Sequence, residues 1–139
     1  MSDHRDLSDT EFLEALERCS LPKEYFNHEA HLRLAWLILQ EYGLDRALWQ
    51  VPRYIKNYVR HLGATDKYHH TLTVAAVYMI HSLRAVKDVK DFDDLLQSFP
   101  KLKSDFKSLV FRHYSQDRFN HHLARSQYIS PDLIAFRTE

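Results

Sequence analysis

Glycine and cysteine are both scarce in this chain of 139 residues, which contains two glycines and one cysteine. A chain of average composition would hold about ten glycines, because glycine makes up roughly 7% of residues. The shortage disfavours all-β folds and nucleotide-binding sites built from glycine-rich loops. The single cysteine, Cys19, excludes an internal disulfide and a zinc site made of several cysteines. With so few helix breakers, the composition predicts an all-α protein.

The chain also lacks an excess of charge and a long hydrophobic run. Lys and Arg together number 19, as do Asp and Glu, so no overall positive field attracts nucleic acid or an anionic membrane. No apolar stretch reaches the roughly 18 residues that a membrane-spanning helix needs. The first ten residues are acidic and polar, unlike a secretory signal. We therefore expect a cytoplasmic protein with no nucleic-acid or membrane partner.

Capping residues and helix breakers predict a single helical domain over residues 1–139, with about five to seven helices. Ser8 and Glu11 form a capping-box pattern before the first helix. Asn27 is a good N-cap for a second helix that reaches residue 42, where Gly43 follows. A third helix is expected over residues 44–62, with a kink or break near Pro52.

The fourth predicted helix, residues 66–86, is the least polar stretch of the chain and is expected to be central. After it, the pattern predicts a short amphipathic helix at 91–99 and another at 101–113. Ser115 is a candidate cap for a further short helix that reaches about residue 124. A turn at Pro131 and Asp132 and a packed C-terminal tail complete the prediction.

The chain is rich in histidine, with ten in all, and four of them occur where burial is expected. Helical periodicity places Glu29 and Arg33 on one narrow stripe of the second helix, which we expect to face solvent. His28 and His31 then point toward the core. His69 and His70 stand together at the start of the central helix.

This arrangement predicts a metal site in which His28, His31 and His69 bind one divalent ion. Imidazole is the commonest neutral metal ligand in proteins, and residues three apart on a helix can reach the same ion. Zinc would suit three histidines with an open position, whereas iron or manganese would suit histidine with carboxylate. His70 is the candidate proton carrier. The patterns of zincin proteases and of di-iron carboxylate centres are both absent.

A structural interpretation of the same histidines stays open beside the catalytic one. A buried polar group without a partner costs roughly 1–3 kcal/mol, so several buried histidines require either a ligand or a hydrogen-bond network. Haem binding through one histidine is a third and weaker alternative. Basic and aromatic residues also alternate around Arg53, Tyr54 and Lys56, but a division into a core face and a solvated face explains them better than nucleic-acid binding does.

Three segments resemble a family of small, uncharacterised bacterial helical proteins with the motifs F-x-H-x-x-H-L, Y-H-x-T-x-T, A-R and P-D-L. They are residues 26–32, residues 68–73, and the stretch from His113 to Leu133. The family usually has glutamate after the Tyr-His pair, where this chain has His70. The resemblance groups His28, His31 and His69 in one site. It implies that Arg125 and Asp132 either support the ligands of that site or bind an anion. It attaches no reaction to any of these residues.

The sequence thus predicts a small metal-dependent enzyme, its ion ligated by histidine, that acts on a small polar molecule. The alternative is a non-catalytic helical module that binds a ligand or partner, with its histidines in a structural network. The aromatic content, 13% of residues, fits either a core or a dimer interface, so a homodimer is left open.

Overall fold

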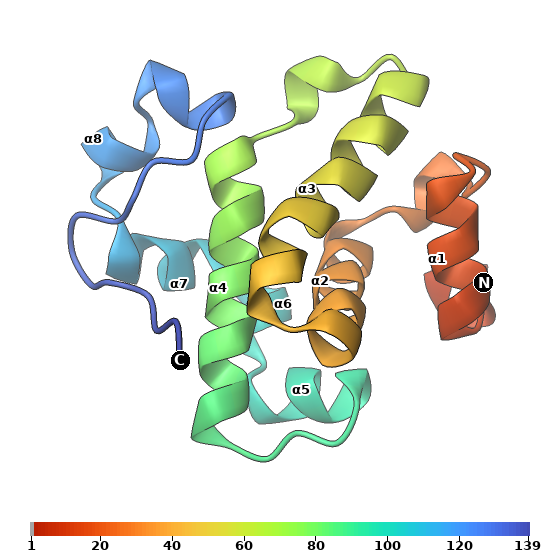
Figure 1. Cartoon of the computed structure of the whole chain (residues 1–139), viewed down its shortest axis with the longest axis horizontal. Helices are drawn as coiled ribbons and strands as arrows, with labels where there is room; N and C mark the ends of the chain where they lie inside the picture. Colours follow the sequence, from red (N-terminus) through yellow and green to blue (C-terminus); the bar gives the residue numbers. More distant parts are fainter. Residues whose placement is uncertain (1) are drawn as a thin grey trace. The chain divides into compact units, whose positions relative to one another are not determined.

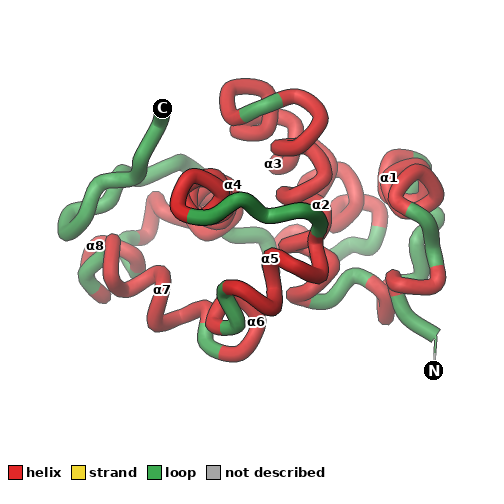
Figure 2. The backbone as a smooth tube through the Cα atoms, turned by 90° about the horizontal axis from the view of Figure 1, so that it is seen from below, coloured by secondary structure: helices red, strands yellow, loops and turns green. Residues whose placement is uncertain are grey.

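The computed structural model describes residues 2–139 and confirms the all-α fold class. Eight α-helices and four short 3-10 helices make up the regular structure of these residues, with no strand among them (Figure 2). That is one α-helix more than the largest number predicted. The chain forms two compact units, one ending at Tyr68 and the other beginning at His69. None of the described helices is both long and apolar enough to cross a bilayer.

The first unit contains three α-helices, which are α1 (Asp9–Glu17), α2 (His28–Tyr42) and α3 (Leu44–His61) (Figure 1). Both predicted N-caps are confirmed. The Ser8 hydroxyl accepts from the Glu11 backbone N–H at 3.1 Å, while the Glu11 carboxylate accepts from the Ser8 N–H at 2.8 Å. The Asn27 side chain accepts from the Ala30 N–H at 2.9 Å. These bonds satisfy N–H groups that the first turn of a helix leaves unpaired.

Both glycines lie at helix ends, as predicted. Gly43 (φ +84°) separates α2 from α3, and Gly63 (φ +69°) follows the last turn of α3. Cys19 also has a positive φ, +57°, at the position that follows α1, as Gly63 does after α3. Its N–H donates to the Leu16 carbonyl at 3.1 Å, and the next N–H donates to the Ala15 carbonyl at 2.8 Å. This is the Schellman arrangement, with cysteine where glycine is usual.

Helix α3 continues through Pro52 without interruption, so of the predicted kink or break the break is wrong. Proline removes one backbone donor from the helix, but burial of the α3 apolar face against the first two helices outweighs that loss. The buried core of this unit includes Phe12, Leu16, Leu34, Ile38, Val51, Ile55 and Tyr58.

The second unit contains α4 (His70–Val86), α5 (Phe92–Ser98), α6 (Lys101–Ser104), α7 (Phe106–His113) and α8 (Gln116–Phe119). The central helix begins four residues later than predicted, because residues 65–67 form a separate 3-10 turn. The predicted helix 101–113 is divided at Asp105, whose non-helical backbone (φ −154°, ψ 60°) separates α6 from α7. Ser115 caps α8 as predicted, with its hydroxyl accepting from the Arg118 N–H at 3.2 Å.

A C-terminal tail without regular structure covers part of the second unit (Figure 2). The Phe136 ring stacks on Tyr78 at 5.0 Å, while its distance from the His113 ring is 4.3 Å. Phe136 also packs against a cluster of buried residues that includes Ala75, Met79, Val110 and Tyr114. The predicted packed tail is therefore present.

Candidate functional site

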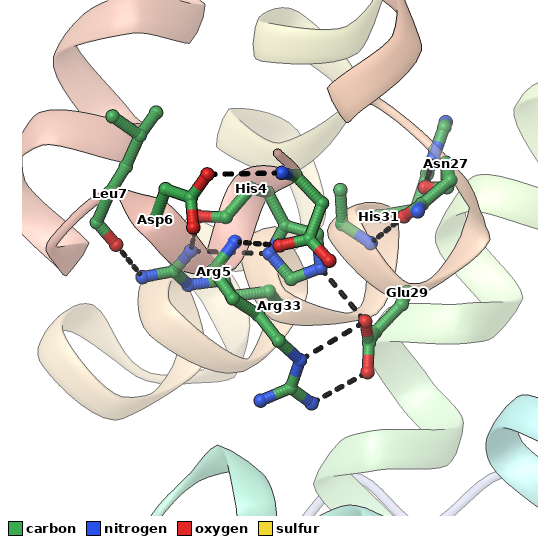
Figure 3. A network of polar contacts seen from close by, with 10 residues as sticks. His4, Arg5, Asp6, Leu7, Asn27, Glu29, His31 and Arg33 are labelled. Carbon is green, nitrogen blue, oxygen red and sulfur yellow. Dashed lines mark hydrogen bonds and ion pairs between the residues drawn. The ribbon is translucent and has the colours of Figure 1, made fainter. Parts of the chain in front are cut away.

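A buried polar network joins the N-terminal segment to the start of α2 (Figure 3). His4 is completely buried, and its Nε2 lies 3.0 Å from Oε2 of Glu29. Arg5 donates to the other carboxylate oxygen of Glu29 at 2.6 Å. A buried carboxylate requires such partners, because an isolated charge in the protein interior is strongly disfavoured.

Arg33 completes this network from the next turn of α2. Its guanidinium donates to the His4 carbonyl at 2.6 Å, the Leu7 carbonyl at 2.8 Å and the Asp9 carboxylate at 2.9 Å. Its Nη1 also lies 3.2 Å from Nδ1 of His4. Because a guanidinium can only donate, Nδ1 accepts and Nε2 carries the hydrogen that His4 donates to Glu29. The network therefore holds His4 as one neutral tautomer.

These contacts bury the stripe of α2 that was predicted to face solvent. Glu29 and Arg33 are buried, whereas His28 is exposed and His31 is half-buried. The N-terminal 3-10 turn (His4–Asp6) bonds to the face that the periodicity assigned to solvent. The expectation that His28 points into the core is therefore wrong, and the paired buried histidine is His4 instead. Sequence reasoning missed His4 because no local pattern distinguishes it.

His31 has one ring nitrogen occupied. Its Nδ1 lies 2.8 Å from the Asn27 carbonyl, and since a carbonyl can only accept, Nδ1 carries the hydrogen. The lone pair is then on Nε2. The ring stacks on Phe26 at 4.0 Å. Burial lowers the pKa of His31, with a smaller lowering from nearby His28, against the raising effect of the Asn27 carbonyl. His31 is consequently a neutral imidazole at neutral pH.

His69 is the N-cap of α4 rather than a residue within it. Its Nδ1 accepts from the Leu72 N–H at 3.0 Å, so the hydrogen of the neutral ring is on Nε2. The ring stacks on Phe119 at 4.7 Å. Burial lowers the pKa of His69, and the positive charge of Arg125 lowers it further. Binding a metal through Nδ1 would require His69 to give up its capping bond.

The structure brings His69, His70 and Arg125 into the second unit, where the 3-10 turn His122–Arg125 packs against α4. His70 is half-buried in the first turn of α4. His28 and His31 belong to the first unit. Among residues 2–139, no group of three His, Cys, Asp or Glu side chains is placed to hold a metal ion.

The residues that carry the family resemblance make structural bonds in the second unit. The Thr71 hydroxyl donates to the Gln127 carbonyl at 2.8 Å and accepts from the Ile129 N–H at 3.1 Å. Tyr114 donates to the Ile129 carbonyl at 2.6 Å. Asp132 accepts from both the backbone N–H and the hydroxyl of Ser115, at 2.8 and 2.6 Å. These bonds hold the C-terminal tail, and the two from Ser115 lower the pKa of Asp132.

An exposed cluster of aromatic and cationic side chains lies where α2 meets α3. Trp49 is 56% exposed and Tyr42 is 41% exposed. The Arg46 guanidinium lies over both rings, 3.9 Å from the Tyr42 centroid and 5.9 Å from that of Trp49, and donates to Gln50 at 2.8 Å. The spacing of residues 42, 46 and 49 was a signal for this cluster that sequence reasoning did not use.

Comparison of the chain with protein-family models, with curated proteins and with solved structures gives no match.

Proposed function

We propose that the chain is a non-catalytic helical module that binds a partner through the exposed face of α3, while its histidines stabilise the two units. The observation that carries this proposal is the cluster of Tyr42, Arg46 and Trp49. These three residue types are the ones most enriched at the energetic centres of protein interfaces. A tryptophan more than half exposed leaves a large apolar ring in water, and a partner that covers it removes that area from solvent.

The contacts of the histidines support the structural half of the proposal. His4 bonds to Glu29 and Arg33, His69 caps α4, and His31 bonds to its own helix. Each of these rings makes the polar contact that burial requires without any ligand. Bonds within each unit thus give these three histidines a structural role.

Hydroxyl-radical footprinting tests the proposal. We expect oxidation of Trp49 and Tyr42 to slow when the purified protein is added to an extract of its source cells, while Tyr128, exposed in the second unit, keeps its rate. Unchanged oxidation of Trp49 in the extract, when the purified protein by itself is monomeric, would contradict the proposal. The protein should also unfold at the same temperature with and without a chelator.

A metal-dependent enzyme is the second candidate, and the geometry of His31 favours it. A histidine that donates Nδ1–H to a backbone carbonyl and leaves Nε2 free has the arrangement usual in metal ligands. In this proposal His31 is a ligand to an iron, manganese or zinc ion that activates a small polar substrate. Stoichiometric metal in the purified protein, lost in a His31→Ala/His69→Ala double variant, would favour this candidate over the first.

A further inference from the structure

The exposed side of α3 carries a continuous stripe of four cations and one tryptophan. Its members follow one another in steps of three and four residues, so they lie on one side of the helix over about 21 Å. All are exposed. We call this set the basic stripe, and it consists of Arg46, Trp49, Arg53, Lys56 and Arg60. The only acid in α3 is Asp45, in its first turn.

Aromatic rings hold most of these cations in place. The Arg46 guanidinium lies over the rings of Tyr42 and Trp49. Arg53 lies 5.1 Å from the centroid of the Tyr54 ring. Lys56 lies 5.7 Å from the centroid of the Tyr68 ring. A cation that already rests on a ring loses less conformational freedom when it binds a carboxylate. The stripe is therefore preorganised for an acidic partner surface.

An acidic surface lies directly beside it on α1. This helix contains four carboxylates and no cation. Three of them step along its exposed side and form what we call the acidic ridge, Glu11, Glu14 and Glu17. The ridge meets the stripe where Arg53 contacts Glu17, with nitrogen–oxygen distances of 3.4 and 3.5 Å. One surface of the first unit is thus half basic and half acidic.

We propose that this surface is an interface between two copies of the chain related by a two-fold axis. Such an axis near Arg53 and Glu17 places the basic stripe of each copy on the acidic ridge of the other, so both complementary contacts form at once. Trp49 and Tyr42 supply the apolar area. The chain has no net charge, so two copies do not repel each other at long range.

The acidic ridge also favours a second copy over nucleic acid as the occupant. A polyphosphate lying along the stripe would run beside Glu14 and Glu17, whose charges repel it. A second copy presents a cation to each of these carboxylates instead. Complementary charge of this kind specifies the partner and its register more than it adds affinity.

Charge reversal tests the dimer on the purified full chain, by sedimentation equilibrium at low salt. The inference deepens the proposed function, because it identifies the partner that covers Trp49. We expect the wild type to dimerise. Lys56→Glu/Arg60→Glu and Glu14→Lys/Glu17→Lys should each be monomeric, because each presents like charges to a copy of itself. Mixed together, the two variants should form a heterodimer, since opposite charges then meet at both contacts.

A matched control separates this interface from general attraction between oppositely charged proteins. Lys101→Glu/Lys103→Glu changes the charge by the same amount on exposed residues of the second unit. It should dimerise as the wild type does, and should associate with Glu14→Lys/Glu17→Lys no more than the wild type does. Trp49→Ala leaves all charges unchanged and should weaken the dimer at least ten-fold. Circular dichroism verifies that every variant is folded.

The proposal is overturned if the wild type stays monomeric at low salt, or if the two reversed variants fail to associate when mixed. Binding of a single-stranded oligothymidine by a monomeric wild type, abolished by Lys56→Glu/Arg60→Glu, would assign the stripe to nucleic acid and also overturn it. A monomer whose Trp49 is nevertheless protected in a cell extract would overturn the dimer and leave the proposed function standing.

Discussion

His4 and Glu29 are separated by 25 positions in the chain, and the His4 Nε2 donates to the Glu29 carboxylate at 3.0 Å. This bond fastens the N-terminal 3-10 turn to the first turn of α2 (Figure 3). His4 is fully buried, and the Glu29 side chain is 9% exposed. A polar pair shielded from water in this way is costly to leave half-formed.

Replacing Glu29 with alanine should therefore destabilise the first unit by about 3 kcal/mol, because the His4 N–H loses its acceptor and Arg5 loses its carboxylate. Urea unfolding measures the loss. Glu41→Ala is the matched control, since Glu41 is exposed on the same helix, and it should change the free energy of unfolding by less than about 0.5 kcal/mol. Equal effects of the two substitutions would show that the network contributes nothing to stability.

The cap at the start of α4 should make stability depend on pH. The pKa of His69 lies below its usual 6.5 in the folded protein because of burial and Arg125, so the folded state favours the neutral ring. Between the folded pKa and 6.5, the unfolded chain binds more protons. The contribution of His69 is then complete above pH 6.5 and is lost as the pH falls through the folded pKa.

His69→Asn separates the cap from the titration. Asparagine is a good N-cap and has no proton to gain, so the variant should keep its stability near neutrality and lose less of it in acid. His69→Ala lacks the cap and should be about 1 kcal/mol less stable at neutral pH. Some dependence on pH should remain in both, because the pKa of His31 is also lowered by burial. If His69→Asn loses as much stability in acid as the wild type, the ring does not act through its titration.

The start of α1 and both ends of α2 and α3 were predictable because the residues that set them act locally. A capping residue bonds within its own first turn, and a glycine sets its own backbone angles, so the roles of Ser8, Asn27 and Gly63 follow from a few residues of sequence. The later start of α4 and the break at Asp105 have no comparable signal. There the turn at residues 65–67 and the non-helical backbone at Asp105 prevail over sequences with good helical periodicity.

Periodicity could not predict that the polar stripe of α2 is buried, because the residues that cover this stripe lie elsewhere in the chain. A helical wheel assigns Glu29 and Arg33 to solvent on polarity alone. In the protein the N-terminal segment supplies His4, two carbonyls and Asp9 as partners, and so both residues are buried at little polar cost. His28, in the first turn of α2, is exposed although Ala35 on the same face is buried, so the prediction that it points into the core was wrong.

Cys19 offers a stabilising substitution. A residue other than glycine in the left-handed conformation costs roughly 1–2 kcal/mol, and Cys19 has φ +57°. Its thiol makes only long contacts to Asn57, at 3.5 and 3.8 Å. Cys19→Gly should therefore raise the free energy of unfolding by about 0.5–1 kcal/mol. Arg18→Gly is the control, because Arg18 has φ −87° and gains nothing from glycine; it should be destabilised.

The hydroxyl of Thr71 should decide whether the C-terminal tail stays attached to the second unit. Thr71 is fully buried and bonds to the Gln127 carbonyl and the Ile129 N–H, so Thr71→Val leaves two backbone groups of the tail without partners. We expect a loss of about 2 kcal/mol and faster hydrogen exchange at Ile129. Thr73→Val is the control. It removes a hydroxyl that bonds only to the His69 carbonyl, and that carbonyl still accepts from the Thr73 N–H. Hydrogen exchange at Ile129 should therefore be unchanged in this variant. Equal exchange at Ile129 in the wild type and Thr71→Val would mean that Tyr114 and the packing of Phe136 hold the tail without Thr71.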